Sequence, residues 1–289
     1  MTRLGRVAEI HRYPVKSMQG ERLSSVEIGP DGVRGDRVWA VRDEGRGGIE
    51  GARKLPSLLS CRARFVEAVP QQGVCPVPEI ELADGTRLRA DDPDLARRLG
   101  SDAGREFSLW PRVPADQLEH YKRGAPDSDD MMTELRSIFG RLENEPLPDL
   151  GAFPVEALTS ATIPGTYFDA YPLLLLTNTS LSTMAAAQPE SNFDASRFRP
   201  NLLIESDDAE GFPENAWVGQ RLRVGSAVFQ IAMACPRCVM TTHAVGAIPT
   251  DRRIMRTLVK ENAGNLGAYA AIETPGTVAE GDAVELLSG

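Results

Sequence analysis

The chain is divided into short apolar or alternating segments by clusters of glycine, proline and aspartate, a pattern that favours short strands over long helices. Segment 23–28 has roughly alternating apolar residues and runs into the turn cluster Gly29-Pro30-Asp31-Gly32. Segments 80–82 and 86–89 lie on either side of an alanine-aspartate-glycine turn, which is typical of a β-hairpin. The first hundred residues therefore predict a small, strongly curved sheet or barrel.

The C-terminal part also consists of strands, and a different segment separates it from the N-terminal part. The run Tyr171-Pro172-Leu173-Leu174-Leu175-Leu176 fits a strand buried on both faces, and the apolar segment 227–233 predicts another. Before them, Met131, Leu135 and Phe139 recur at helical spacing. We predict a β-rich α+β protein in three parts: an N-terminal β-barrel-like domain at 1–100, a helical and loop connecting segment at 101–165, and a second strand-rich domain with a few short helices at 166–289.

Charge and composition argue against several classes of protein. The net charge of −9 does not suit nonspecific nucleic-acid binding, which depends on lysine and arginine. No run of about 18 uncharged apolar residues is present, so we expect no membrane span, and the N-terminus lacks the apolar run of a secretory signal. Four cysteines in 289 residues make no disulfide framework, so we expect a reducing, cytoplasmic setting.

Two of the cysteines form a Cys-x-x-Cys motif, Cys235-Pro236-Arg237-Cys238, at the end of an apolar strand. Half of a zinc site would need a second pair of ligands, and the sequence offers no motif-like pair. A thioredoxin-type dithiol would open a helix, whereas this pair follows a strand. Two buried structural cysteines remain possible. A single reactive or metal-bound thiolate next to Arg237 is the interpretation that we favour, since a neighbouring cation stabilises charged sulfur.

A second motif, Arg197-Phe198-Arg199-Pro200-Asn201, has the side chains of an anion site. Two guanidinium groups beside an amide suit a phosphate together with the edge of a heterocycle. Taken alone, a solvated arginine pair that enters a strand is the better interpretation. Lys16-Ser17 offers one cation and one hydroxyl, which is again a weak signal alone.

The combination of motifs is more specific than any of its members. Four motifs follow one another along the chain: Tyr13-Pro14-Val15-Lys16-Ser17, Gly35-Asp36-Arg37-Val38-Trp39, Arg197-Phe198-Arg199-Pro200-Asn201 and Cys235-Pro236-Arg237-Cys238-Val239-Met240-Thr241-Thr242. Together they resemble the MOSC proteins (molybdenum cofactor sulfurase C-terminal domain) that carry the associated N-terminal β-barrel domain. The layout is similar to that of the mitochondrial amidoxime reducing component and its bacterial relatives. The resemblance covers nearly the whole chain except about residues 100–165, and it implies a MOSC-type β-barrel at 166–289.

The resemblance implies a molybdenum–molybdopterin cofactor and assigns residues to it. Cys238 matches the cysteine that ligates molybdenum, which makes it both the metal ligand and the catalytic position. The positions that match cofactor-binding residues are Lys16, Ser17, Arg37, Ser180, Arg199 and Asn201. The implied reaction is the reduction of N-hydroxylated substrates such as amidoximes, hydroxylamines and N-hydroxylated bases. We further expect Arg237 to support the thiolate electrostatically.

Two features of the chain depart from the family pattern. After Thr241-Thr242 the chain has His243, where the family often has an aspartate-proline turn; a surface histidine is the more plausible interpretation, and a local proton donor is the alternative. No cysteine-rich iron–sulfur extension is present, so we expect no such cluster in this chain. Electrons would then come from a separate flavin or iron–sulfur partner. Two alternatives stay open: a cofactor carrier without turnover, and a sulfur carrier with a persulfide on Cys238.

Overall fold

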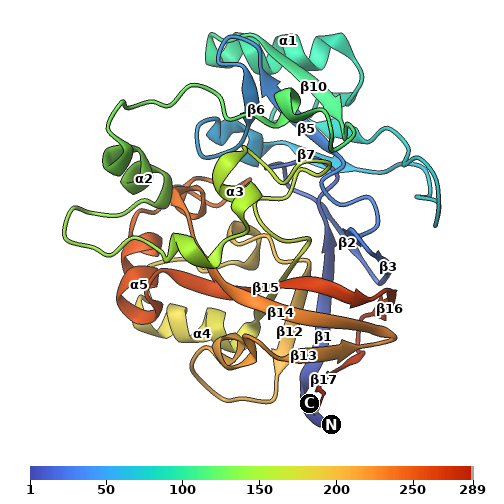
Figure 1. The fold of residues 1–289 in the computed structure, drawn as a ribbon, viewed down its shortest axis with the longest axis vertical. Helices are drawn as coiled ribbons and strands as arrows, with labels where there is room; N and C mark the ends of the chain where they lie inside the picture. The colour runs from blue at the N-terminus through green and yellow to red at the C-terminus, as the bar shows by residue number, and fades with distance from the viewer. Residues whose placement is uncertain (288–289) are drawn as a thin grey trace.

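The computed structural model describes residues 1–287 and is built around one closed β-barrel (Figure 1). Hydrogen bonds close the barrel in the order β1 (Thr2–Arg12), β12 (Leu202–Ser206), β11 (Leu173–Thr177), β15 (Asn265–Thr274), β14 (Ala227–Pro236), β13 (Arg221–Val224) and β17 (Ala283–Leu286). A further strand, β2 (Glu21–Leu23), extends the sheet from β1. Only β11 and β12 pair in parallel among these neighbours.

The N-terminal strand β1 closes this barrel, although the other six strands come from the C-terminal half. It pairs with β12 on one side, where Ile10 lies opposite Leu202, and with β17 on the other, where Thr2 lies opposite Leu286. The two ends of the chain therefore lie side by side (Figure 1). Gly5 permits a close approach here, because a Cβ atom on it would lie 2.2 Å from the Glu205 carbonyl oxygen.

Alternation of side chains along the strands places one apolar face inside the barrel. In β14, Ala227, Phe229 and Ile231 are buried, and the residues between them are half-buried. β11 differs because all five of its residues are buried. One face of β11 contributes Leu173 and Leu175 to the barrel core, while Leu176 packs among the helices outside. The continuous apolar run in the sequence follows from this double burial.

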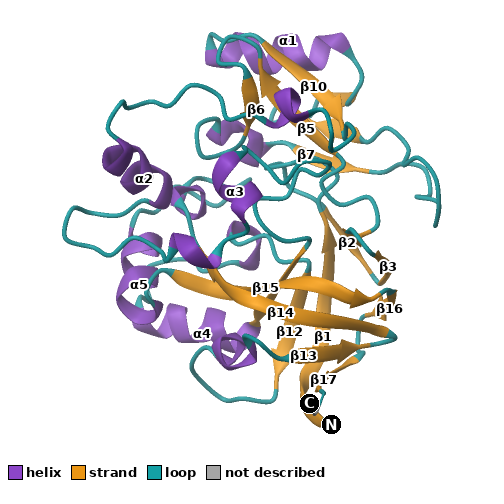
Figure 2. Ribbon diagram, in the orientation of Figure 1, coloured by secondary structure: helices purple, strands orange, loops and turns teal. Residues whose placement is uncertain are grey.

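A second layer of strands lies above the barrel and comes from the N-terminal part of the chain, up to Pro111 (Figure 2). One sheet contains β5 (Trp39–Asp43), β6 (Gly48–Glu50) and β10 (Phe107–Pro111), and another contains β7 (Arg62–Arg64), β8 (Glu79–Glu81) and β9 (Arg87–Arg89). Helix α1 (Pro93–Ala103) packs with them through Leu95 and Leu99. A third small sheet, made of β3 (Ser25–Gly29), β4 (Gly32–Val33) and β16 (Gly276–Ala279), joins the N- and C-terminal parts.

The remaining helices lie on one side of the molecule (Figure 2). They are α2 (Met131–Phe139), α3 (Val155–Thr159), α4 (Asn178–Ala187) and α5 (Arg253–Asn262). α4 and α5 cover the barrel through a cluster that includes Met184, Phe198 and Leu258. Within residues 1–287, no helix combines the length and apolarity that crossing a bilayer requires.

The β-rich α+β class with a barrel and few helices is confirmed. The predicted hairpin is present as β8 and β9, and the predicted helix begins at Met131 behind its N-cap Asp130. Segment 23–28, expected as one strand, is divided between β2 and β3, because Ser24 separates a strand that pairs with β1 from one that pairs with β16.

Candidate cofactor site

Cys238 lies where a barrel strand ends and a turn begins. β14 ends at Pro236, and the short 3-10 helix η6 (Val239–Thr242) starts directly after Cys238. Cys235 is still inside β14 and buried, whereas Cys238 is half-buried, and both thiols are free. Burial raises the pKa of the Cys238 thiol, although the nearby Arg53 guanidinium opposes this rise. The two cysteines therefore have different environments, and only Cys238 is partly accessible.

Five of the residues predicted from the sequence meet in one narrow cavity of about 50 Å³, which we call the inner cavity. The residues on both sides of the candidate ligand, Arg237 and Met240, also line it. The predicted residues in its wall are Lys16, Ser17, Arg37, Arg199 and Asn201. They come from the N-terminal third and from the segment before β12, which β1 brings together.

Backbone strain is concentrated in this wall. Ser17, Arg37 and Arg199 have φ values of 67°, 48° and 56°, in the left-handed region that residues other than glycine seldom adopt. Among the non-glycine residues that the structure describes, Ala263 alone shares this property. Such strain costs on the order of 1–3 kcal/mol per residue and persists where the surroundings enforce it, often at functional sites.

Arg199 is a buried cation with one unused donor group. Its Nη1 donates to the Met18 carbonyl, and its Cζ lies 4.2 Å from the centroid of the Tyr13 ring. The buried Nη2 has no hydrogen-bond partner among the described residues. Burial, together with repulsion from Arg37, lowers the pKa of Arg199 to about 10. The side chain thus retains its charge at neutral pH but lacks an anionic partner.

Arg237 is held in a similar way by backbone carbonyls. Its Nε donates to Leu266 over 2.7 Å and its Nη1 to Phe198 over 2.9 Å, while the buried Nη2 has no partner in the described part of the chain. Gly267 makes room for this group, because a Cβ atom on it would lie 2.6 Å from the Leu175 carbonyl and 3.2 Å from Arg237 Nη2. Arg237 acts on the Cys238 thiol in the expected direction by lowering its pKa, but Arg53, which the sequence did not single out, has the larger effect.

The two arginines of the Arg-Phe-Arg motif have different surroundings. Arg197 is 1% exposed, and no part of it lines the inner cavity. Its guanidinium donates to four backbone carbonyls, those of Asn192, Thr241, His243 and Pro249. Arg197 therefore holds the loop that follows Cys238 in place. Of the two guanidinium groups predicted to share one anion, only that of Arg199 lines the inner cavity.

Lys16 is paired with a carboxylate that the sequence analysis did not single out. Its Nζ lies 2.7 Å from Asp169 Oδ1 and donates to the Tyr167 carbonyl over 3.2 Å. Burial lowers the pKa of Lys16, and Asp169 opposes the fall. Although desolvation would raise it, Lys16 and Arg53 hold the pKa of Asp169 well below its usual range. No motif marks Arg53 or Asp169, because isolated charged residues of this kind are common on surfaces.

Arg37 is held by a buried carboxylate. It forms an ion pair with Asp36, which also accepts a hydrogen bond from the Tyr13 amide over 2.6 Å. The side chain of Asn201 is likewise engaged by the backbone: Oδ1 accepts from Leu174 N over 3.2 Å and Nδ2 donates to the His11 carbonyl over 3.3 Å. Asn201 thus ties β11 to β1 beside the cavity.

Ser180, also predicted from the sequence, is not part of this wall. It lies in α4, fully buried, and its hydroxyl donates to the Glu214 carboxylate. Thr177, the N-cap of α4, lies 3.0 Å from the same hydroxyl. The hydrogen-bonding capacity of Ser180 is therefore used to start α4.

His243 follows η6 and is half-buried, so it is not the freely exposed turn residue that we favoured. Its Nε2 is buried without a hydrogen-bond partner among the described residues, and burial lowers its pKa. In residues 1–287 there is no group of three or more His, Cys, Asp or Glu residues placed to hold a metal ion. Cys235 and Cys238 consequently lack the further protein ligands of a zinc site.

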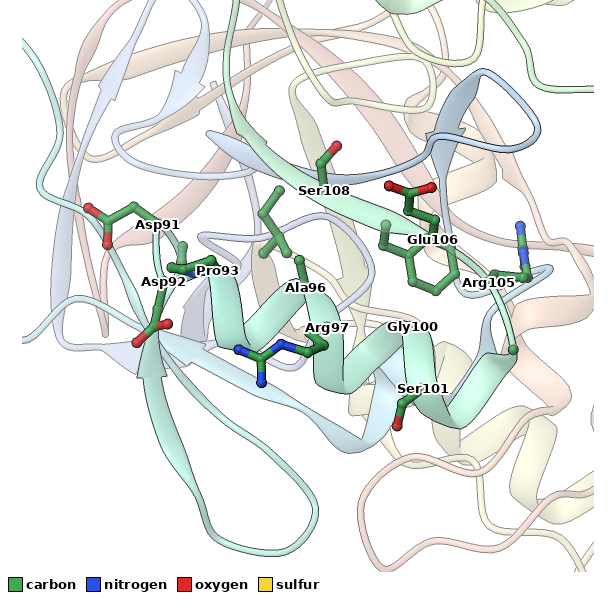
Figure 3. Close-up of a pocket in the computed structure, with 14 residues that line it drawn as sticks. Asp91, Asp92, Pro93, Ala96, Arg97, Gly100, Ser101, Arg105, Glu106 and Ser108 are labelled. Atoms are coloured by element: carbon green, nitrogen blue, oxygen red, sulfur yellow. The ribbon is translucent and has the colours of Figure 1, made fainter.

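Larger hollows lie outside the inner cavity: one of about 510 Å³ shares Arg199 with it, and two others do not. The first of these two, about 370 Å³, shares Lys16 with the inner cavity; we call it the arginine cleft and define it by Lys16, Arg53, Lys54, Arg123, Ile138 and Val239. The second, about 830 Å³, lies between α1 and β10 and contains none of the predicted site residues (Figure 3).

Comparison with known proteins gives two family matches that agree with this architecture. The sequence model of the MOSC domain matches residues 164–285, and that of the MOSC N-terminal beta barrel domain matches residues 4–92. The mouse mitochondrial amidoxime-reducing component 1 is 26% identical over 99% of this chain and 84% of its own length. The human mitochondrial amidoxime reducing component 2 is 27% identical over 84% of this chain and 68% of its own length.

Solved structures show more distant similarity. The YuaD protein from Bacillus subtilis aligns with 99% of this chain and 97% of its own, at 11% identity and a TM-score of 0.46. YiiM from Escherichia coli aligns with 41% of this chain and 55% of its own, at 21% identity and a TM-score of 0.32. The two family matches together span most of the sequence, and the chain therefore belongs to the MOSC family, with both the MOSC domain and the MOSC N-terminal beta barrel domain.

Proposed function

We propose that this protein binds a molybdenum–molybdopterin cofactor and reduces N-hydroxylated substrates with electrons from a separate flavin or iron–sulfur partner. Cys238 is the proposed metal ligand. The proposed cofactor-binding residues are Lys16, Ser17, Arg37, Arg199 and Asn201, with Arg237 added from the geometry. Ser180 has an indirect role in this proposal, because its hydroxyl is bonded within the start of α4.

One observation supports the proposal most strongly. Within residues 1–287, the Nη2 atoms of Arg199 and Arg237 are buried without partners, and both residues line the inner cavity. Cys238 is not in the lining of this cavity, but its sequence neighbours Arg237 and Met240 are. A buried, unpaired donor on a charged group is costly, so natural structures retain one mainly where a ligand or ion completes it. An anionic group, such as the phosphate of a pterin cofactor, would complete both guanidinium groups with charge-assisted hydrogen bonds.

The residues present fit such a cofactor chemically. The phosphate would have Arg199 and Arg237 as donors, with Lys16 and Arg37 adding positive charge. A soft thiolate is a suitable ligand for a sulfur-coordinated transition metal, and Cys238 is partly accessible. The inner cavity has room for only one or two water molecules, so its lining side chains have to move outward to admit a pterin.

When bound, molybdenum supplies the redox chemistry, in which the N–O bond of the substrate breaks with uptake of two electrons and two protons and release of water. The chain itself holds the ligand and shapes access. Arg197 fixes the loop after Cys238 through four carbonyls, and Arg237 fixes Phe198 and Leu266 on either side. The strained φ values of Ser17, Arg37 and Arg199 keep these side chains preorganised toward the cavity.

Reduction of benzamidoxime by molybdenum-loaded protein with reduced methyl viologen as donor tests the proposal. We expect benzamidine to form with the wild type and not with Cys238→Ser. A full molybdenum load without any turnover would instead support a cofactor carrier. A labile sulfur on Cys238, seen by intact mass in metal-free protein, would support the sulfur carrier. We further propose a reducing, cytoplasmic setting, because four cysteines in 289 residues make no disulfide framework.

A further inference from the structure

The arginine cleft lies next to the candidate metal ligand and has a mixed lining. Val239, which follows Cys238 directly, lines it, and Lys16 lines both the cleft and the inner cavity. Arg53 is close enough to Cys238 to be among the main charges acting on its thiol. A molecule in the cleft would therefore contact Val239, the residue that directly follows Cys238. The volume of about 370 Å³ is within the range of small-molecule sites.

Most of the charges in the cleft neutralise one another. Lys54 Nζ lies 3.0 Å from carboxylate oxygens of both Asp127 and Glu134. Glu50 is paired with Arg105, which lies outside the lining. Lys16 is paired with Asp169. These ion pairs leave no carboxylate of the cleft lining without a cation.

Two arginines of the cleft have no such partner. Within residues 1–287, neither Arg53 nor Arg123 has a carboxylate oxygen within 4.0 Å of its guanidinium nitrogens. Arg123 makes one hydrogen bond, from Nη2 to the Ala157 carbonyl over 2.5 Å. The two guanidinium groups lie close enough for Arg53 to lower the pKa of Arg123, after burial, which is the main cause. Asp169 lies near enough to act on both charges, but neither arginine is in an ion pair with it. Two neighbouring cations without a direct carboxylate partner form a site that an added anion would stabilise.

The rest of the lining is apolar where a flat organic group could pack. Ile49 comes from β6, Ile138 from α2 and Val239 from η6, so three separate elements supply the apolar wall. A ligand that uses both features has an apolar body and one anionic substituent. Arginine suits a carboxylate especially well, because its planar donors match the two oxygens.

We propose that the arginine cleft selects N-hydroxylated substrates that carry a carboxylate, with Arg53 and Arg123 binding the carboxylate and Ile49, Ile138 and Val239 contacting the apolar body. This inference rests on the proposed reductase function and specifies its substrate class. It uses groups that the proposed cofactor site leaves unassigned.

Binding of two matched probes to molybdenum-loaded protein tests this inference. The probes are 4-carboxybenzamidoxime and benzamidoxime, titrated by calorimetry without an electron donor so that no turnover occurs. We expect Arg123→Gln to raise the Kd of the carboxylated probe about tenfold or more, which corresponds to the loss of one charge-assisted hydrogen bond. The same substitution should change the Kd of benzamidoxime by less than about twofold, because benzamidoxime has no carboxylate. Arg123→Lys should restore part of the preference.

Lys122→Gln is the matched control, since it removes the same charge from the neighbouring exposed residue, which is paired with Glu119 outside the cleft. Equal Kd values for the two probes in the wild type, or equal effects of the two Gln variants, would overturn the inference. Loss of molybdenum from Arg123→Gln would assign the cleft to the cofactor and also overturn it. Selective binding without reduction of either probe, once a donor is added, would refute the reductase function and leave the anion selectivity intact.

Discussion

The guanidinium of Arg199 lies over the ring of Tyr13, with Cζ 4.2 Å from the ring centroid. The hydroxyl of the same tyrosine donates to the Pro200 carbonyl over 3.0 Å, so Tyr13 contacts two consecutive residues of the C-terminal motif. Tyr13 directly follows β1, the strand that closes the barrel. The position of Arg199 in the inner cavity therefore depends on an N-terminal residue far from it in sequence.

Substitution of Tyr13 should separate the hydrogen bond from the stacking. Tyr13→Phe removes only the hydroxyl, and we expect a loss of about 1 kcal/mol in the free energy of unfolding. Tyr13→Leu also removes the ring beneath Arg199, and we expect a loss of about 3 kcal/mol together with a reduced molybdenum content. Urea denaturation and metal analysis measure the two effects. Equal destabilisation by both substitutions would mean that the ring contributes nothing to the position of Arg199.

Arg197→Gln should destabilise the protein strongly. The side chain is 1% exposed and donates to four carbonyls, among them those of Thr241 and His243 in the loop after Cys238. Glutamine can replace at most two of these donors, so we expect the free energy of unfolding to fall by about 3 kcal/mol or more. Hydrogen exchange should rise locally in residues 239–249. A stable variant with unchanged exchange in that loop would contradict the role assigned to Arg197.

In metal-free protein, Arg199→Gln should not lower the stability, in contrast to Arg197→Gln. Its unpartnered Nη2 and the burial that lowers its pKa to about 10 make the cation unfavourable when no anion is bound. We expect the Tm of metal-free Arg199→Gln to equal or exceed that of the wild type, while molybdenum retention falls. A lower Tm of the variant in the metal-free state would show that Arg199 stabilises the protein without a bound anion, which would contradict this role.

Glu214 provides a test that depends on pH. It is 1% exposed, its Oε1 accepts from Thr177 N over 3.0 Å, and burial raises its pKa despite these hydrogen bonds. A carboxyl group with a raised pKa in the folded state contributes stability that is full below its unfolded pKa of about 4.3 and is lost as pH rises through its folded pKa. The Tm of Glu214→Gln should therefore gain on that of the wild type as pH rises from about 4 to about 8. A constant difference across this range would refute the assignment.

Several elements of the fold could be predicted from the sequence because they depend on interactions between residues close together in the chain. Thr177 caps α4 and Asp130 caps α2, as their side chains and the following apolar spacing indicate. The buried strand β11 follows from its uninterrupted leucines. These features depend on short-range hydrogen bonding and on side-chain periodicity, which a sequence records directly.

The parts that could not be predicted depend on contacts between distant segments. β1 has too many charged residues to indicate a barrel strand, yet its pairing with β12 and β17 closes the barrel. Arg197 and Arg199 look equivalent in sequence, but their side chains have different surroundings. Arg199 has a positive φ and lines the cavity, whereas Arg197 ends the 3-10 helix η4 (Ala195–Arg197) and donates to the loop after Cys238. No sequence motif marks Arg53 or Arg123. That neither of them is in an ion pair becomes visible only in the folded structure, where the nearby carboxylates pair with other cations.

The central claim, that Cys238 ligates molybdenum, is tested most directly by metal analysis of gently purified protein from a host that makes the cofactor. Cys235→Ser is the matched control, since that thiol is buried inside β14 and only three residues away. We expect stoichiometric molybdenum in the wild type and in Cys235→Ser, and none in Cys238→Ser. Molybdenum that persists in Cys238→Ser, or its absence from the wild type, would contradict the claim.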